Sequence, residues 1–181
     1  MKSQRYRPLL MALFTAGSMT IGAKINFELG AVPQSAQTFF LCLTALYFAP
    51  KEVLFGQIIY LVTGLFTPVF SGTAYGVDYI FHSNATGYLI SFPFAAFLLS
   101  KYGKGGDLFG TVSWCVLAHA VVLMYGYVNL FAFRNFTADV AVHEGVLKFL
   151  PGALLKSLVA GLIYWAAEKY LRKRNHENTP V

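Results

Sequence analysis

The sequence predicts an all-α integral membrane protein with six transmembrane helices. Three observations support this fold class: 56% of the 181 residues are hydrophobic, only 12% are charged, and the mean hydropathy is +0.55. Such a composition is typical of a chain that lies inside a bilayer. The apolar residues gather into six segments: Pro8 to Ala23, Gln37 to Ala49, Val53 to Phe66, Gly87 to Ser100, Leu108 to Phe133 and Leu147 to Tyr170.

The chain is expected to form one membrane domain over residues 1–181, because it has no fixed-period repeat and no Pro/Ser-rich linker. The first segment follows a basic stretch, Lys2 to Arg7, as in a secretory signal peptide. No small-residue cleavage site follows Thr20, so we expect a retained helix. Ala12 and Ala16 form a small-xxx-small pair that lets another helix approach closely, either within the chain or on a partner protein.

The second, third and fourth segments are shorter than the roughly 20 residues that cross a bilayer. Their helices are therefore expected to extend into flanking polar residues. Pro50, Lys51 and Glu52 end the second segment and predict a tight turn that makes segments two and three a hairpin.

Lysine and arginine predict the orientation, since loops rich in these residues stay in the cytoplasm. One alternating set of loops holds Lys2, Arg5, Arg7, Lys51, Lys101, Lys104, Lys169, Arg172, Lys173 and Arg174, and the other holds Lys24, Arg134 and Lys148. Both termini are therefore expected to be cytoplasmic. The net charge of +6 reflects this topology, and no basic patch interleaved with aromatic residues predicts nucleic-acid binding.

The predicted outer side has long loops, which usually carry function. The loop Thr67 to Thr86 contains Phe70, Tyr75, Tyr79 and Phe81, which suit either a pocket wall or anchoring at the headgroup level.

Three polar side chains lie near the predicted outer surface. Asp78, in the same loop, is either an exposed carboxylate, a salt-bridge partner or a ligand contact. Gln34 and Gln37 lie near the outer mouth of the second segment, where they either cap the helix or meet a ligand.

No metal or catalytic pattern is evident in the sequence. Cys42 and Cys115 fall within apolar segments and are expected to pack as small hydrophobes. His82, His119 and His143 are too scattered for a metal-ligand motif. Asp139, His143 and Glu144 could support acid–base chemistry, but no nucleophile motif accompanies them.

Lys156 is a single ammonium within the apolar run Phe149 to Ala167. A lysine in a membrane span costs about 2.5 to 3.5 kcal/mol at the bilayer centre, so it snorkels, finds a counter-ion or lines a polar cavity. Pro151 and Gly152 place the helix start about five residues earlier, roughly 7 to 8 Å away. Because helical side chains lean toward the N-terminus, the ammonium should point outward.

Three stretches resemble one family. They are Leu29 to Thr38, which is similar to LGPVPxTxQT; Pro68 to Gly72 with Gly76, followed by Gly87 to Pro93 with Ala95 and Ala96; and Phe149 to Lys156. Together they resemble BioY, the biotin-specific S component of energy-coupling-factor (ECF) transporters.

The resemblance implies a six-helix S component that captures biotin from outside the bacterial cytoplasmic membrane. It also implies that the protein works with a transmembrane coupling protein and two ATPases. The chain has no Walker A motif, so any ATP chemistry would belong to these partners. Biotin would be the transported ligand, with no cofactor. The implied docking residues are Ala12 and Ala16.

Biotin offers a carboxylate for a cation, a ureido group for amides and an apolar body for aromatic rings, and which end of biotin meets Lys156 stays open. The candidate residues are Lys156, Asn84, Tyr75, Tyr88, Gln37, Phe70 and Asp78. Two departures from the family pattern are present. Ala153 replaces the aspartate of PGDxxK, and Ser83 to Thr86 replaces GPTGGY or SPTxGY.

Two other functions stay open. The departures are compatible with an S component or solitary carrier for a different small vitamin. A small membrane enzyme using His143, Glu144 or Asp139 would belong to another class of protein.

Overall fold

Helices dominate the computed structural model of the protein, which describes residues 2–27 and 30–177. Leu29, in the first motif, lies outside the described residues. The long helices are α1 (Lys2–Lys24), α2 (Gln37–Tyr47), α3 (Pro50–Thr63), α5 (Thr86–Tyr102), α6 (Leu108–Val128) and α8 (Leu150–Glu177). Each predicted apolar segment overlaps one of them.

Short elements occupy the segments that were expected to be loops. They are strands β1 (Asn26–Phe27) and β2 (Gln34–Ser35), helices α4 (Val77–His82) and α7 (Ala138–Val142), and the wider π-helical turns η1 (Asn129–Phe133) and η2 (His143–Leu147). β1 and β2 pair antiparallel. The turn η1 continues α6 to Phe133, the predicted end of the fifth segment, and η2 follows α7 directly, so helical backbone outside the predicted segments precedes α8.

The expected lengthening of the short helices is wrong for α2. The backbone N–H of Ala36 donates to the carbonyls of Gly22 (3.0 Å) and Ile25 (2.9 Å), which keeps the chain extended before Gln37. At the other end, Phe48 is extended as well. By contrast, α3 does begin in the polar turn, where the Glu52 carboxylate accepts the Ala49 N–H at 2.8 Å.

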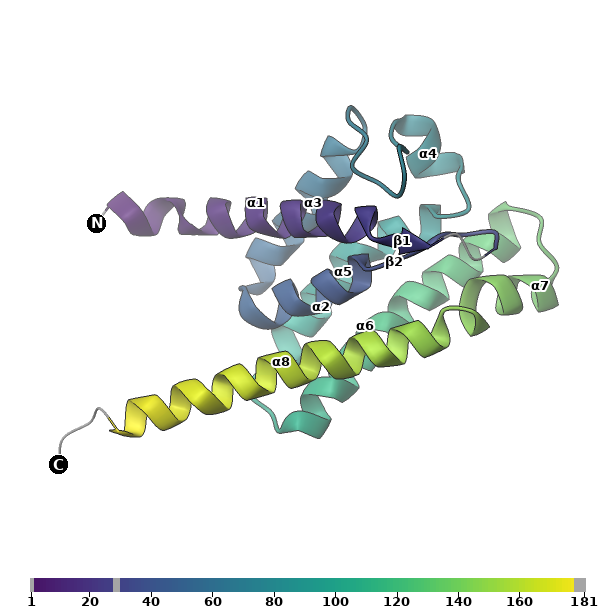
Figure 1. Cartoon of the computed structure of the whole chain (residues 1–181). Coiled ribbons are helices and arrows are strands. Elements are labelled where there is room, and N and C mark those ends of the chain that lie inside the picture. The colour runs from purple at the N-terminus through teal and green to yellow at the C-terminus, as the bar shows by residue number, and fades with distance from the viewer. Residues whose placement is uncertain (1, 28–29, 178–181) are drawn as a thin grey trace.

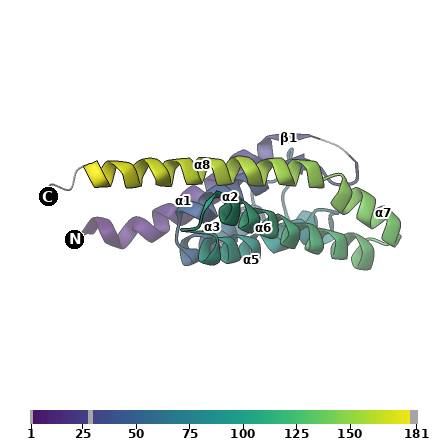
Figure 2. The same cartoon turned by 90° about the horizontal axis from the view of Figure 1, so that it is seen from below.

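The helices form a bundle with two distinct ends. In Figures 1 and 2 the start of α1 and the far end of α8 lie at one end, which we call the terminal end. The β1–β2 hairpin, α4 and α7 lie toward the other, the loop end. α1 packs on α2 and α3, α5 packs on α3 and α6, and α8 packs on α6 and α2. α3 therefore packs mainly on α1 and α5, and only slightly on its predicted hairpin partner α2.

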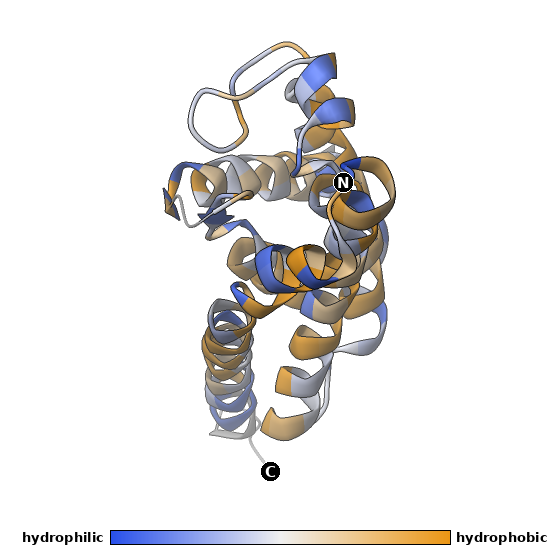
Figure 3. Ribbon diagram, turned by 90° about the vertical axis from the view of Figure 1, so that its right-hand side faces the viewer, coloured by the Kyte–Doolittle hydropathy of each residue, from blue (hydrophilic) through white to orange (hydrophobic). Residues whose placement is uncertain are grey.

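The outer surface of the bundle is apolar. Large hydrophobic side chains are exposed along the helices, including Leu13, Phe14, Phe109, Leu117, Met124, Leu155, Leu158 and Leu162. Figure 3 shows hydrophobic residues along the helices and most hydrophilic residues in the loops and at helix ends. Among the described residues, the helices Leu108–Phe133 and Ala138–Arg174 are long and apolar enough to cross a bilayer. Such a surface suits lipid rather than water.

The small-residue pair of α1 faces the interior. Ala12 and Ala16 are both buried, and the Ala12 carbonyl lies against Gly56 of α3. Both side chains therefore pack inside the described chain, and Ala12 lies at the α1–α3 contact.

Candidate ligand-binding site

A cavity lies near the loop end, where segments distant in the sequence meet. Its lining residues come from the β1–β2 hairpin, α2, the 64–76 loop, α4, α5, α6 and the start of α8. They are Val32, Pro33, Ser35, Gln37, Thr38, Phe70, Ser71, Tyr79, Ala85, Tyr88, Leu89, Phe92, His119, Val122, Leu123, Phe149, Ala153 and Lys156.

The segment from Gly30 to Ser35 closes one side of the cavity because side chains on both flanks hold it. Asn84 donates its amide to the Ala31 carbonyl at 3.1 Å. The Ala31 N–H donates to the Glu144 carboxylate at 3.2 Å, and Gln34 donates to the Lys148 carbonyl at 2.6 Å. Glu144 also pairs with Lys148. This segment thus bridges the start of α5 and the turn before α8.

A second segment, the 64–76 loop, closes another side and is held by Lys24. The Lys24 ammonium donates to three backbone carbonyls, those of Pro68 (2.6 Å), Phe70 (3.0 Å) and Gly72 (2.6 Å). An ammonium has three protons, so these three bonds use its full donor capacity. The sequence placed Lys24 among the outer-side charges but gave no signal of contacts 44 to 48 residues away.

Lys24→Met is therefore expected to free this loop. Loss of the charged donor should raise amide exchange of residues 68–74 at least about tenfold, or about 1.4 kcal/mol of opening free energy, since hydrogen bonds to charged groups contribute about 1.5 to 3 kcal/mol. Hydrogen–deuterium exchange measured by mass spectrometry checks this. Lys51→Met, at the terminal end, is the matched control. Equal exchange of residues 68–74 in both variants would contradict the role of Lys24.

Aromatic rings form two walls of the cavity. Phe70, 1% exposed, stacks on Tyr79 with ring centroids 5.5 Å apart and meets Tyr60 edge-on at 5.3 Å. On the other side, Tyr88 packs on Phe149 at 5.4 Å and donates its hydroxyl to the Gly145 carbonyl at 2.8 Å. Each ring therefore has aromatic or hydrogen-bond partners that orient it, and such flat surfaces suit an apolar ligand body.

Lys156 and Gln37 are two of the polar side chains that line the cavity between these walls. The partly buried Lys156 donates to the Ser35 carbonyl at 3.0 Å, and no carboxylate of the described residues forms an ion pair with it. Gln37 donates to the Tyr60 hydroxyl and accepts from the Ser35 hydroxyl, both at 2.7 Å. The cavity therefore holds a cation without an anionic partner, which favours an anionic ligand.

The structure brings together only some of the candidate residues. Lys156, Gln37, Phe70 and Tyr88 line the cavity. Asn84 lies beside it and holds the 30–35 segment, as described above.

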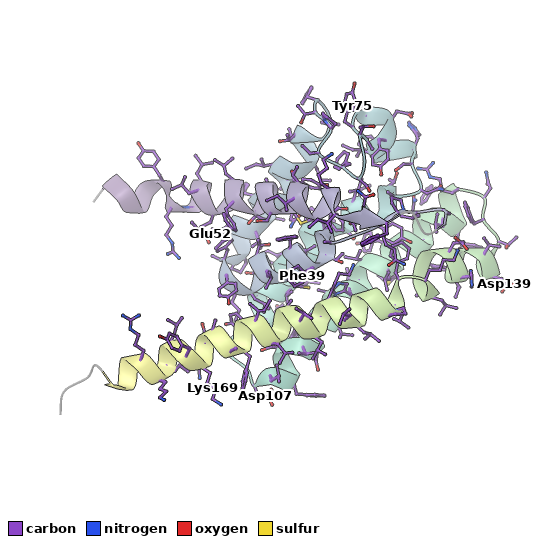
Figure 4. The ribbon with its side chains drawn as sticks, in the orientation of Figure 1. Phe39, Glu52, Tyr75, Asp107, Asp139 and Lys169 are labelled. Atoms are coloured by element: carbon purple, nitrogen blue, oxygen red, sulfur yellow. The ribbon has the colours of Figure 1, made fainter. Side chains whose placement is uncertain are left out.

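The other two candidates lie away from the cavity. Tyr75 is 56% exposed on the 64–76 loop, where Figure 4 shows it at the outer edge of the molecule. Asp78 is exposed on α4 and pairs with His82 at 3.1 Å.

Several lining residues were not among the sequence candidates. Tyr79 was one of four aromatic residues in its loop, and only packing shows that it stacks on Phe70. His119 was considered only as a metal ligand and rejected. Phe149 belongs to the third motif. A useful signal for His119 would have been a polar residue in the middle of an apolar helix, the same signal that drew attention to Lys156.

The residues considered for acid–base chemistry do not form a site. Asp139 lies in α7 at the edge of the molecule (Figure 4), and no ion pair or side-chain hydrogen bond joins its carboxylate to His143 or Glu144 among the described residues. Glu144 is engaged with Lys148, the Ala31 N–H and His143 (3.2 Å). Among the described residues, no group of three or more His, Cys, Asp or Glu side chains could hold a metal ion.

The cavity is nearly closed in this structure. Its volume is about 50 Å³, whereas pockets for drug-sized ligands enclose roughly 300 to 1,000 Å³. Binding of a vitamin-sized molecule therefore requires the aromatic walls or the two closing segments to move apart.

Comparisons with known proteins identify what the chain resembles. The sequence profile of the BioY family matches residues 1–173. The chain is 33% identical over 155 residues to the probable biotin transporter BioY of Pyrococcus horikoshii, covering 85% of this chain and 91% of that protein. It is 30% identical over 172 residues to the biotin transporter BioY of Rhizobium etli, covering 86% and 89%.

A solved structure shows the same fold. The S-component for biotin from an ECF-type ABC transporter superposes with a TM-score of 0.83 at 20% identity, covering 93% of this chain and 94% of that one. The arrangement of helices is therefore that of an ECF S-component.

Proposed function

Because this chain belongs to the BioY family, we propose that it binds biotin and mediates its uptake as the S component of an ECF-type transporter. The observation that carries the proposal is the cavity between the aromatic walls, in which the Lys156 ammonium has no carboxylate partner among residues 2–27 and 30–177. Biotin has a carboxylate for this cation and an apolar thiophane ring for Phe70 and Tyr88. The proposed binding residues are therefore Lys156, Phe70 and Tyr88.

The proposed topology has six membrane-spanning helices in one domain, with both termini in the cytoplasm. The loop end would then face outward and present the cavity to external biotin. Two features support this arrangement: basic residues concentrate at the terminal end, as the positive-inside rule requires, and the two closing segments lie at the loop end. α2 has 11 residues, too few to cross a bilayer alone, so its ends would meet protein and not lipid.

Energy for uptake would come from partner proteins. The sequence contains no Walker A motif, so ATP hydrolysis would belong to two ATPases linked through a transmembrane coupling protein. Since Ala12 and Ala16 are buried in the described chain, docking on α1 would use the exposed side chains beside them. Co-purification of the natively expressed protein would identify these partners.

Binding and uptake can be tested directly. We expect the purified protein to bind biotin saturably by isothermal titration calorimetry and to restore growth of a biotin-auxotrophic host on low biotin. Absence of both would overturn the proposal.

A different small vitamin is the second candidate ligand, and one observation favours considering it. Ala153 lines the cavity where the family motif has aspartate, so the carboxylate of that motif is missing here. Competition of unlabelled vitamins against labelled biotin separates the two: biotin should compete best, and stronger competition by another vitamin would reassign the ligand.

A further inference from the structure

His119 of α6 presents an unused hydrogen-bond acceptor at the cavity. Its side chain is 4% exposed and lines the cavity. Nδ1 lies 3.0 Å from the Cys115 carbonyl, an atom that can only accept, so Nδ1 carries the proton. The Ser157 hydroxyl lies 2.9 Å from the same nitrogen and can share this proton. In this tautomer Nε2 is an acceptor, and it has no partner among the described residues.

A buried polar atom without a partner is rare in native proteins and needs an explanation. In the described part of the chain, the buried side chains with such atoms are Thr38, Gln57, Thr111 and His119. Two of these, Thr38 and His119, line this one cavity from opposite helices. Their coincidence there indicates that a bound molecule completes their hydrogen bonds.

We propose that Nε2 of His119 accepts a hydrogen bond from a ureido N–H of bound biotin. This assignment rests on the proposed function and deepens it. An acceptor needs a donor from the ligand. At neutral pH the carboxylate of biotin is ionised, its thioether has no proton, and its only donors are the two ureido N–H groups. The ureido end of biotin is therefore the end that can donate a hydrogen bond to His119.

The depth of His119 in the bundle fits this assignment. Lys156 donates to Ser35, just before α2, whereas Nδ1 of His119 lies 3.8 Å from the Cys42 sulfur, within α2. From the start of α2 at Gln37 to Cys42 is roughly 7 to 8 Å at 1.5 Å per residue.

The His119 ring thus lies beside the second turn of α2, whereas the Lys156 ammonium lies beside the start of that helix. Biotin also carries its two polar ends on opposite sides of an apolar body. Its ureido group would meet His119, and its valerate arm would extend toward Lys156.

Two variants separate the two ring nitrogens of His119. In His119→Asn the amide can keep the bond to Cys115 but cannot reach the position of Nε2. In His119→Gln the side-chain oxygen can replace Nε2 as acceptor. We expect His119→Asn to weaken biotin binding about five- to tenfold, the range of a neutral hydrogen bond, and His119→Gln to retain most of the affinity. Calorimetry measures both, with monodispersity and thermal unfolding as folding controls.

Ligand analogues give a second readout that does not depend on small changes in folding. The wild-type protein should bind biotin more tightly than a biotin methylated on a ureido nitrogen, and His119→Asn should reduce this ratio. The ratio of biotin to biotinamide, which lacks the carboxylate, should stay unchanged in the same variant.

The role of His119 and the binding of biotin itself fail on different outcomes. Unchanged affinity in a folded His119→Asn, or equal losses in the Asn and Gln variants, overturns the role of His119 and leaves biotin binding intact. Absence of biotin binding by the wild-type protein overturns the proposed function and this assignment together.

Discussion

Lys156→Met is expected to weaken biotin binding at least about tenfold, or about 1.4 kcal/mol, while the protein still inserts and folds. The ammonium is partly buried, and among the described residues its hydrogen-bond partner is the Ser35 carbonyl. A carboxylate would add a charge-assisted hydrogen bond, roughly twice as strong as a neutral one. Methionine has a similar length and no charge, so it removes this interaction and eases insertion into the bilayer.

The matched control for this prediction is Lys169→Met, the same change on the same helix. Lys169 lies at the terminal end of α8, shown in Figure 4, where its ammonium sits over the Trp165 ring at 4.8 Å. Calorimetry should give wild-type affinity for the control. Biotinamide adds a test of mechanism, since Lys156→Met should bind biotin and biotinamide equally. Unchanged biotin affinity in Lys156→Met would mean that the lysine only snorkels.

Hydropathy predicted the long helices because the bilayer imposes one requirement on all of them, a continuous apolar run. It could not predict α4 or α7, because these short helices lie at the loop end and need no continuous apolar run. It also misjudged α2, since the bonds from Ala36 to the carbonyls of Gly22 and Ile25 keep the preceding residues extended. Those contacts depend on where α1 ends, which a single segment does not reveal.

The candidate site was predicted in part, for a similar reason. Charge and aromatic content drew attention to Lys156 and Phe70, and the family resemblance added Tyr88. Nothing in the sequence could tell that Tyr79 turns inward while Tyr75 turns outward. The three carbonyl contacts of Lys24 were equally hidden, because they use backbone atoms, which every residue carries. Sequence patterns therefore indicate which residues can bind a ligand, and packing decides which of them reach it.

Gly64→Ala is expected to disrupt the cavity through Phe70. Gly64 ends α3 with φ near −67°, a conformation that alanine adopts without strain. However, an added Cβ would overlap the Phe70 ring. That ring is held between Tyr60 and Tyr79 and lines the cavity. It would have to move, and overpacking of this kind costs about 1 to 3 kcal/mol of stability.

Gly64→Ala should impair biotin binding more severely than it impairs folding. The Phe70 ring has aromatic neighbours on two sides, so a push from Gly64 directs it toward the small cavity, where it would compete with the ligand for space. We expect biotin affinity to fall more than about tenfold in protein that still unfolds cooperatively. Gly106→Ala is the control, because its Cβ would meet nothing within 4 Å. Wild-type affinity in folded Gly64→Ala would show that Phe70 can yield elsewhere, and that this wall of the cavity adapts to the ligand instead of being fixed before it binds.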